Sequence, residues 1–300
     1  MNEHSHTHHH HRHGKAFAIG IAINTAFVLA EIVYGISANS LALLADAGHN
    51  ASDVVGLIMA WGAIQLASRK TSERFTYGLQ SASIIAALGN ALLLLITVGG
   101  IGYEAIQRLA SPETAAAHTV MIVAAIGALV NGVTAMLFHT HDHHDMNIHG
   151  AFLHMVADAA ISLGVVLSGF LILKTGWLWL DPAASLAIII VILIGTWKLL
   201  RESVTLALHA APQHIDLMEV KNYLGALGGV KEVHDLHIWA MSTTGVAMSA
   251  HLLMPGGHPG DAFIGHITHE LEHRFHINHA TLQIEIGDGT HCDIGCDHDH

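Results

Sequence analysis

Charged residues are scarce in this chain of 300 residues. Asp, Glu, Lys and Arg make up 12% of it, 52% of the residues are hydrophobic, and the mean hydropathy is +0.47. Ordinary soluble domains carry about twice that share of charge, so we expect an integral membrane protein. Cysteine is also nearly absent: Cys292 and Cys296, close to the C-terminal end, are the only two, which excludes a disulfide framework. The formal net charge of −12 argues against a nucleic-acid partner.

Long apolar runs are what the chain has in abundance. A helix needs about 20 apolar residues to span a bilayer. Residues 1–15 form a histidine-rich, disordered arm without a signal-peptide cleavage site, so we expect the first apolar run to remain in the membrane. Six spans are predicted, at roughly 16–37, 41–67, 79–107, 118–138, 150–174 and 183–207.

The distribution of Lys and Arg predicts how these spans are oriented. An even number of spans places both termini on one side, and the more basic side is cytoplasmic. Only Arg108 and Lys174 fall on the other side of the membrane. We therefore expect cytoplasmic termini and a cytoplasmic histidine-rich loop at 139–149. As a separate expectation, the membrane is a bacterial inner (plasma) membrane. The basic residues on the side of the termini are Arg12, Lys15, Arg69, Lys70, Arg74, Lys198 and Arg201.

Two short motifs within the spans carry metal-binding chemistry. Span two contains His49-Asn-Ala-Ser-Asp53 and span five contains His154-Met-Val-Ala-Asp158. Residues four apart share one face of a helix, so each motif can offer two ligands to one point. Two imidazoles and two carboxylates form a tetrahedral zinc set, although each pair alone could equally be a polar contact between helices.

Further polar residues are expected to face the interior of the bundle, where other polar groups can satisfy them. Asp46 lies on the same helical face as His49 and could orient that imidazole. Asp181-Pro182 suits the start of the sixth helix, with the aspartate as its cap. The other polar residues of this kind are Asn24, Glu31, Asn90 and Asn131.

The character of the sequence changes after about residue 211, where apolar runs give way to a short α-β-β-α-β pattern. This order predicts a small two-layer α+β domain with its helices on one face of a sheet. The predicted elements are helices at 215–227 and 261–276 and strands at 230–241, 246–254 and 279–286. The predicted domains are thus the arm (1–15), the membrane domain (16–208), the α+β domain (209–288) and a Cys/His/Asp-rich tail (289–300).

With these motifs in view, the chain resembles the cation diffusion facilitator family of zinc transporters over nearly its whole length. Supporting segments are Ser40-Leu-Ala-Leu-Leu-Ala-Asp-Ala-Gly-His49, Arg74-Phe-Thr-Tyr-Gly78 and Val233-His-Asp-Leu-His-Ile-Trp239. The resemblance implies six membrane helices, a ferredoxin-like cytoplasmic domain, and a homodimer that exchanges cytoplasmic Zn²⁺ for protons. It implies a transport site made by His49, Asp53, His154 and Asp158, a set associated in this family with a preference for zinc.

The resemblance also implies that the C-terminal domain binds zinc. Matching positions nominate His234, His251 and Glu285, with His279 as a further ligand. Some members hold metal in the loop between spans two and three, but here Ser68-Arg-Lys-Thr-Ser-Glu-Arg74 contains no histidine, so we expect none there. Cys292 and Cys296 in the tail are candidate ligands for further metal capture.

One motif favours a different class of protein. His269-Glu-Leu-Glu-His273 matches HExxH, and His279 stands at the spacing of a third zinc ligand, so a membrane-anchored zinc protease using Glu270 is an alternative. Helical periodicity gives another explanation. Ile267 and Leu271 form part of an apolar stripe, and the histidines lie on the opposite, solvent-facing side.

Ligand chemistry by itself predicts proton coupling. A histidine must be neutral to bind a metal and takes a proton near neutral pH, so metal and protons compete for the same nitrogens. We therefore expect a secondary transporter that alternates its access between the two sides of the membrane, and not an enzyme. A metal-gated channel or sensor remains an alternative, and Cd²⁺, Co²⁺ and Ni²⁺ remain possible besides Zn²⁺.

Overall fold

A computed structural model describes residues 10–67, 69, 71–139 and 146–287, with side chains from Asn24 onward except at 60, 64, 137–139 and 146–151. The described residues fall into two compact units, one within 1–58 and 90–198 and the other within 59–89 and 199–300. The predictions for residues 1–9 of the arm, for residues 140–145 of the loop, and for Cys292 and Cys296 lie outside the described residues. The predicted bounds of the arm and the loop are too wide, because residues 10–15 belong to the first helix and residues 146–149 to the fifth.

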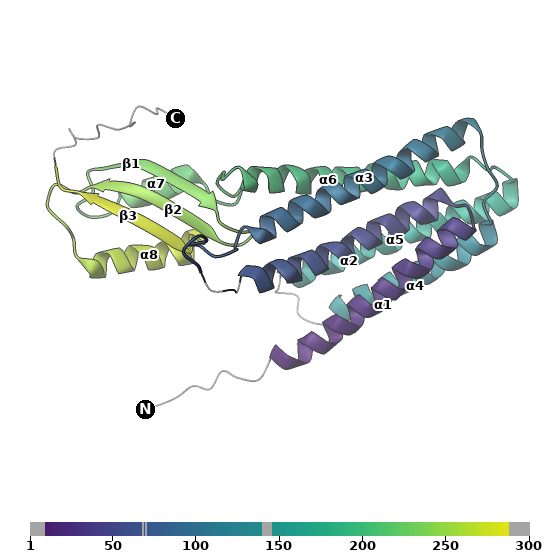
Figure 1. Ribbon diagram of the computed structural model, residues 1–300, viewed down its shortest axis with the longest axis horizontal. Coiled ribbons are helices and arrows are strands. Elements are labelled where there is room, and N and C mark those ends of the chain that lie inside the picture. The colour runs from purple at the N-terminus through teal and green to yellow at the C-terminus, as the bar shows by residue number, and fades with distance from the viewer. Residues whose placement is uncertain (1–9, 68, 70, 140–145, 288–300) are drawn as a thin grey trace. The chain divides into compact units, whose positions relative to one another are not determined.

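The first part of the chain forms six long helices separated by short connections (Figure 1). Four described segments are long and apolar enough to cross a membrane: Ala82–Ala110, Ala117–Met136, Phe152–Thr175 and Leu180–Ala207. The second helix, which carries Asp46, His49 and Asp53, is not among these four. The predicted bundle of membrane helices is confirmed, with α1 at His10–Ser37, α2 at Leu41–Ala67, α3 at Ala82–Ala110, α4 at Ala117–His139, α5 at Met146–Thr175 and α6 at Leu180–Ala207.

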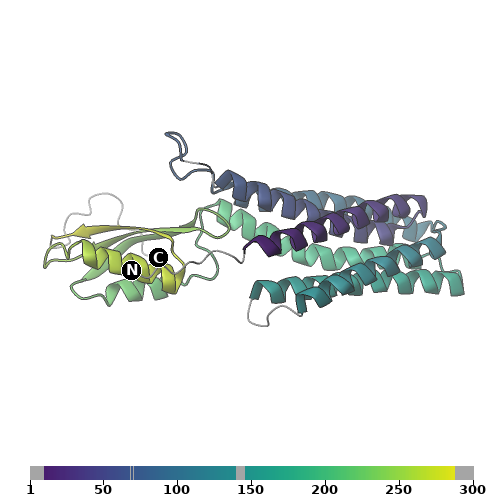
Figure 2. The same cartoon turned by 90° about the horizontal axis from the view of Figure 1, so that it is seen from below.

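Successive helices run in alternating directions, so α2 and α5 are antiparallel (Figures 1 and 2). The apolar core of the first unit draws on α2 to α6 and contains alanines at many close contacts, among them Ala42, Ala45 and Ala124. Small side chains let helix backbones approach closely, which is how membrane helices gain packing without a hydrophobic driving force. The core therefore holds α2 firmly among its neighbours.

The start of α2 is fixed by a residue from α6. Asp181 accepts hydrogen bonds from the backbone N–H of Leu41, at 2.8 Å, and from the hydroxyl of Ser40. The sequence predicts Asp181 as the cap of its own helix, and this is wrong: α6 begins at Leu180, and the carboxylate satisfies the orphan N–H of a different helix. Its side chain therefore ties α6 to α2.

The second unit contains the α+β domain, whose predicted order of elements is confirmed. Its sheet has the order β1-β2-β3, with β1 and β2 antiparallel and β2 and β3 parallel. The parallel pair is joined through a helix, as such connections require. The elements are α7 at Leu217–Gly225, β1 at Glu232–Ala240, β2 at Val246–Leu253, α8 at Asp261–Phe275 and β3 at His279–Glu285.

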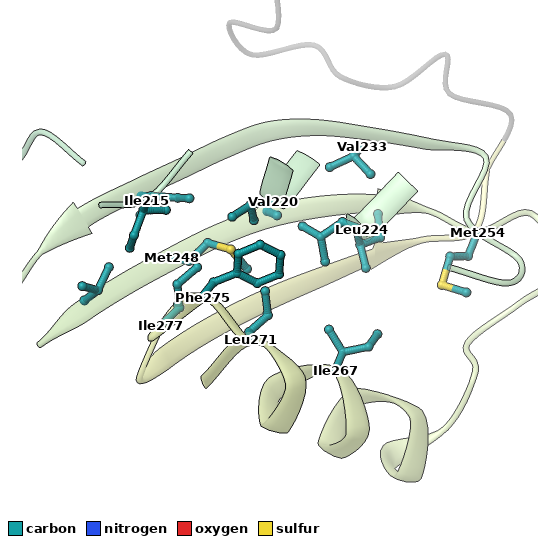
Figure 3. Packing of buried hydrophobic residues seen from close by; sticks show 14 residues of the cluster. Ile215, Val220, Leu224, Val233, Met248, Met254, Ile267, Leu271, Phe275 and Ile277 are labelled. Atoms are coloured by element: carbon teal, nitrogen blue, oxygen red, sulfur yellow. The ribbon is translucent and has the colours of Figure 1, made fainter. Parts of the chain in front are cut away.

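Both helices of this domain pack on one face of the sheet. Figure 3 shows Val220 and Leu224 of α7 and Leu271 of α8 lying against strand residues such as Met248. The apolar stripe predicted for α8 is buried, and its histidines at positions 266, 269, 273 and 276 are exposed. The other face of the sheet is left free of helices within the described domain.

Truncation of this core provides a test. Leu271 is completely buried, so Leu271→Ala should destabilise the domain by about 2–5 kcal/mol through lost burial and a residual cavity. Hydrogen–deuterium exchange of the β1–β3 amides in the full chain measures the loss. The exposed residue on the same helix gives the control, since His269→Ala should change stability by less than about 0.5 kcal/mol. Equal protection in Leu271→Ala and the wild type would contradict the packing.

Candidate metal sites

The two His-x-x-x-Asp motifs meet at one place in the bundle. His49 and Asp53 lie one turn apart on α2, and His154 and Asp158 lie one turn apart on α5. Because the helices are antiparallel, each histidine faces the aspartate of the other helix. The Nε2 atom of His49 is 3.3 Å from Oδ1 of Asp158, and Nε2 of His154 is 3.2 Å from Oδ2 of Asp53.

These separations fit the dimensions of a zinc site. Nitrogen and oxygen ligands bind Zn²⁺ at about 2.0–2.2 Å, which places neighbouring ligand atoms of a tetrahedron about 3.4 Å apart. The cross-helix distances lie close to this value, and the distances within α2 and α5 are 3.9 and 3.6 Å. His49, His154 and Asp158 form the tightest group, with one ligand atom of each within 4.8 Å of the others. Asp53 stands beside this group, next to His154.

The four side chains differ in exposure in a regular way. Asp158 and His49 are 2% and 15% exposed, whereas Asp53 and His154 are 34% and 43% exposed. A cavity of about 310 Å³ adjoins the more exposed pair, and Asp53, His154 and Asp158 line part of it. An ion can thus reach the ligands from the side of Asp53 and His154.

Asp46 supports the site differently from the sequence prediction, which has it orient His49. Its Oδ2 accepts a hydrogen bond of 2.9 Å from Ser162, one turn beyond Asp158 on α5. The Nδ1 atom of His49 has no hydrogen-bond partner among the described residues. Asp46 therefore joins α2 to α5 close to the ligands, and holds the two helices in register.

Two further hydrogen bonds link α2 to its neighbours. Asn50 donates to Oε2 of Glu31 on α1 at 3.0 Å, and Ser52 donates to Oδ1 of Asn90 on α3 at 3.3 Å. The polar residues of the spans thus face inward, in agreement with the sequence prediction. Sequence reasoning missed the roles of Asn50 and Ser52, although both lie between the two candidate ligands of α2.

A second cluster lies on the sheet of the α+β domain. His234 of β1 and His251 of β2 are direct partners in the antiparallel ladder, and Glu285 ends the adjacent strand β3. Glu285 reaches both imidazoles, at 3.2 Å from Nε2 of His234 and 3.0 Å from Nδ1 of His251. The alternating residues of β2, such as Met248, face the helices, so this cluster occupies the face without helices.

Asp235 joins this cluster, and sequence reasoning missed it. The ladder shifts register between His234 and His237, and Asp235 adopts a left-handed conformation with φ of 50°. This bulge points its carboxylate at His251 Nε2, at 3.4 Å, and at His237 Nε2, at 2.9 Å. A signal was present: the core-facing residues Val233 and Leu236 are three apart, where a regular strand would space them by two.

His279 lies away from the cluster. It begins β3, six residues before Glu285, or about 20 Å along a strand, and its ring stands edge-on to Tyr77 with centroids 5.5 Å apart. The HExxH alternative gains no support either. His269 and His273 are close together, with ring centroids 4.3 Å apart, but no described metal-ligand group includes them with His279.

The fold and these side-chain groups define a multi-pass membrane protein with candidate metal ligands in its helical bundle and on a separate α+β domain. The chain belongs to the cation efflux, or cation diffusion facilitator, family. The family model for the cation efflux transmembrane domain matches residues 17–206, and that for the cation efflux protein cytoplasmic domain (ZT_dimer) matches residues 212–286. The resemblance read from the motifs is confirmed.

Characterised relatives cover most of the chain. The metal cation efflux system protein CzcD of Cupriavidus metallidurans is 34% identical over 91% of this chain and 86% of its own. The cadmium, cobalt and zinc/H⁺-K⁺ antiporter of Bacillus subtilis is 33% identical over 90% of this chain and 88% of its own. The zinc transporter ZitB of Escherichia coli is 33% identical over 90% of this chain and 86% of its own.

The hydrogen bond between Ser162 and Asp46 can be tested with a matched serine. Ser162→Ala should cost about 1–3 kcal/mol of stability, because it leaves a buried carboxylate oxygen without its donor. It should also weaken zinc binding by loosening α5 against α2. Ser185, on α6, is equally buried, but its hydroxyl has no hydrogen-bond partner among the described residues, so Ser185→Ala should be nearly neutral. Thermal unfolding and zinc titration in detergent measure both effects, and indistinguishable variants would contradict the role of Asp46.

Proposed function

We propose that the chain exports zinc from the cytoplasm in exchange for protons, with His49, Asp53, His154 and Asp158 as the transport site. The observation that supports this most directly is the meeting of two imidazoles and two carboxylates at zinc-ligand separations inside an apolar bundle. Groups of this polarity are costly among membrane helices and are retained there for function.

The donor set favours zinc among the metals that the named relatives handle. Imidazole and carboxylate in tetrahedral arrangement suit Zn²⁺, and no cysteine precedes position 292, which disfavours Cu⁺ at the bundle. Two imidazoles among four ligands disfavour Mg²⁺ and Mn²⁺. The same set accepts Cd²⁺ and Co²⁺, which appear in the name of the Bacillus subtilis relative.

Proton exchange follows from the charge of the site. Its two carboxylates carry two negative charges, which are balanced either by one Zn²⁺ or by one proton on each histidine. Metal binding needs neutral imidazoles, so protons that arrive from outside displace zinc, and the emptied, protonated site returns to release them inside. Alternation between two open states lets each exchange occur on one side only.

We further propose that both termini and the α+β domain are cytoplasmic, as the distribution of Lys and Arg predicts. The bacterial relatives support a bacterial inner membrane as the location. In this orientation the second cluster samples cytoplasmic zinc. His234, His251 and Glu285 supply three donors, and Asp235 lies close enough to take part. His279 is not included, because it lies at the other end of β3. Zinc on this face would stabilise the homodimer that the ZT_dimer family match supports.

Removal of single ligands tests the transport site. His49→Ala and Asp158→Ala should each reduce pH-gradient-driven zinc flux in proteoliposomes to that of empty vesicles, because the most buried ligands hold the ion. Zinc and proton fluxes are recorded together. Thr196→Val is the control, since Thr196 is buried and, among the described residues, its hydroxyl bonds within its own helix, to the carbonyl of Ile192. Retained flux in either ligand variant would refute the assignment.

Zinc binding by the α+β domain is tested through stability. At a zinc concentration about 100-fold above the dissociation constant, binding should stabilise the domain by about 2.7 kcal/mol. Hydrogen exchange of β1–β3 in the full chain and the dimer fraction by analytical ultracentrifugation report the effect. His251→Ala should abolish it, whereas His266→Ala, on the exposed face of α8, should preserve it. A zinc response equal in both variants would rule out this cluster as its origin.

A further inference from the structure

Four asparagines surround the cavity beside the transport site. The cavity of about 310 Å³ adjoins Asp53 and His154 and is large enough for several water molecules. A polar amide within an apolar membrane helix is expensive unless it serves binding or passage, yet four successive helices each place one in this wall. They are Asn24 of α1, Asn50 of α2, Asn90 of α3 and Asn131 of α4.

The hydrogen bonds within the protein use only part of the donors and acceptors of these amides. Each amide has two N–H donors and a carbonyl acceptor. Asn50 commits its amino group to Glu31, and Asn90 accepts from Ser52 through its carbonyl. Asn131 is only 3% exposed, and its amino group has no partner among the described residues. Unused hydrogen-bonding capacity of this kind, in the wall of a cavity beside the transport site, indicates a ligand that hydrogen-bonds to the wall.

The position of Asn90 depends on the helix opposite. Gly56 of α2 faces it, and a Cβ atom at that position would lie 2.9 Å from Nδ2 of Asn90. A side chain there would push the amide away from α2 or out of the cavity. Gly56 lies one turn from Asp53 on α2. Because position 56 has no side chain, the amide of Asn90 can pack against α2 there and line the cavity wall.

We propose that this cavity is an antechamber for a hydrated divalent cation before its transfer to the four ligands. The amides of Asn50, Asn90 and Asn131 bond to the waters around the ion: their carbonyls accept from waters bound to the ion, and their free N–H groups donate to waters of the next layer. The inference rests on the proposed zinc transport and adds a second, water-mediated site to it. A cation arrives with bound waters, and water-bridged contacts to polar groups stabilise it nearly as well as direct ones.

The neutrality of the amides matters to this role. Carboxylates in the wall would bind the ion itself and hold it short of the transport site. Amides interact with the waters of the ion without adding charge. Binding in the cavity is therefore strong enough for the ion to enter and weak enough for it to leave, as conduction pathways require. The shell can then be exchanged in steps, with Asp53 and His154 as the first protein ligands that the ion meets.

The experiment separates access from binding. Zinc transport by Asn131→Leu in proteoliposomes should show kcat/KM lowered about three- to tenfold, the effect of one hydrogen bond. Equilibrium zinc affinity of the same protein, measured by competition with a chelating dye, should stay within about twofold of the wild type. Thr134→Val is the matched control, because Thr134 lies one turn further along α4, outside the cavity wall. Within the described part of the chain its hydroxyl donates to the carbonyl of Val130 in its own helix. It should leave both quantities unchanged.

A second variant tests the need for neutrality. Asn131→Asp should lower kcat, because the added carboxylate retains the ion. Wild-type kcat/KM in Asn131→Leu, or a loss of equilibrium affinity equal to its loss of kcat/KM, would overturn the antechamber. Wild-type kcat in Asn131→Asp would overturn it as well. Failure of the proposed transport is distinguishable, because it would appear as zinc flux retained in His49→Ala.

Discussion

Hydrogen bonds from polar side chains hold the helix α2 in place among its apolar neighbours. A polar group exposed at a soluble surface finds water, whereas one within a membrane bundle must find a partner on another helix. Each such bond of α2 leads to a different neighbour. Its bonds are Leu41 to Asp181 of α6, Asp46 to Ser162 of α5, Asn50 to Glu31 of α1, and Ser52 to Asn90 of α3. Two of the four ligands of the proposed transport site, His49 and Asp53, therefore lie on a helix that polar side chains attach to α1, α3, α5 and α6.

The antiparallel pairing of α2 and α5 divides the four ligands into two layers. His49 and Asp158 form the more buried layer, and Asp53 and His154 form the more exposed layer. Each layer combines one imidazole and one carboxylate from opposite helices. A relative shift of one helical turn, about 5.4 Å, would break both layers at once. Occupancy of the site and the register of the two helices are thus coupled by geometry.

Sequence reasoning predicted the features that depend on local periodicity. The His-x-x-x-Asp spacing, the six apolar runs, the order of elements after residue 211 and the exposed histidines of α8 all follow from which residues share a face. It failed where the partner is set by tertiary packing. Asp181 suits the cap of its own helix, and only the packing of α6 against α2 directs its carboxylate to Leu41. Asp46 likewise has a histidine one turn away, yet bonds to Ser162.

The two clusters differ in what holds their ligands together. On the sheet, backbone hydrogen bonds pair His234 with His251 and keep Glu285 on the neighbouring strand, so their spacing changes only if the ladder breaks. Among the described residues of the bundle, no backbone hydrogen bond joins α2 to α5, and the register depends on side chains such as Asp46. A sheet therefore suits a site that reports metal at equilibrium. A pair of helices suits a site that must bind the ion in one arrangement and release it in another.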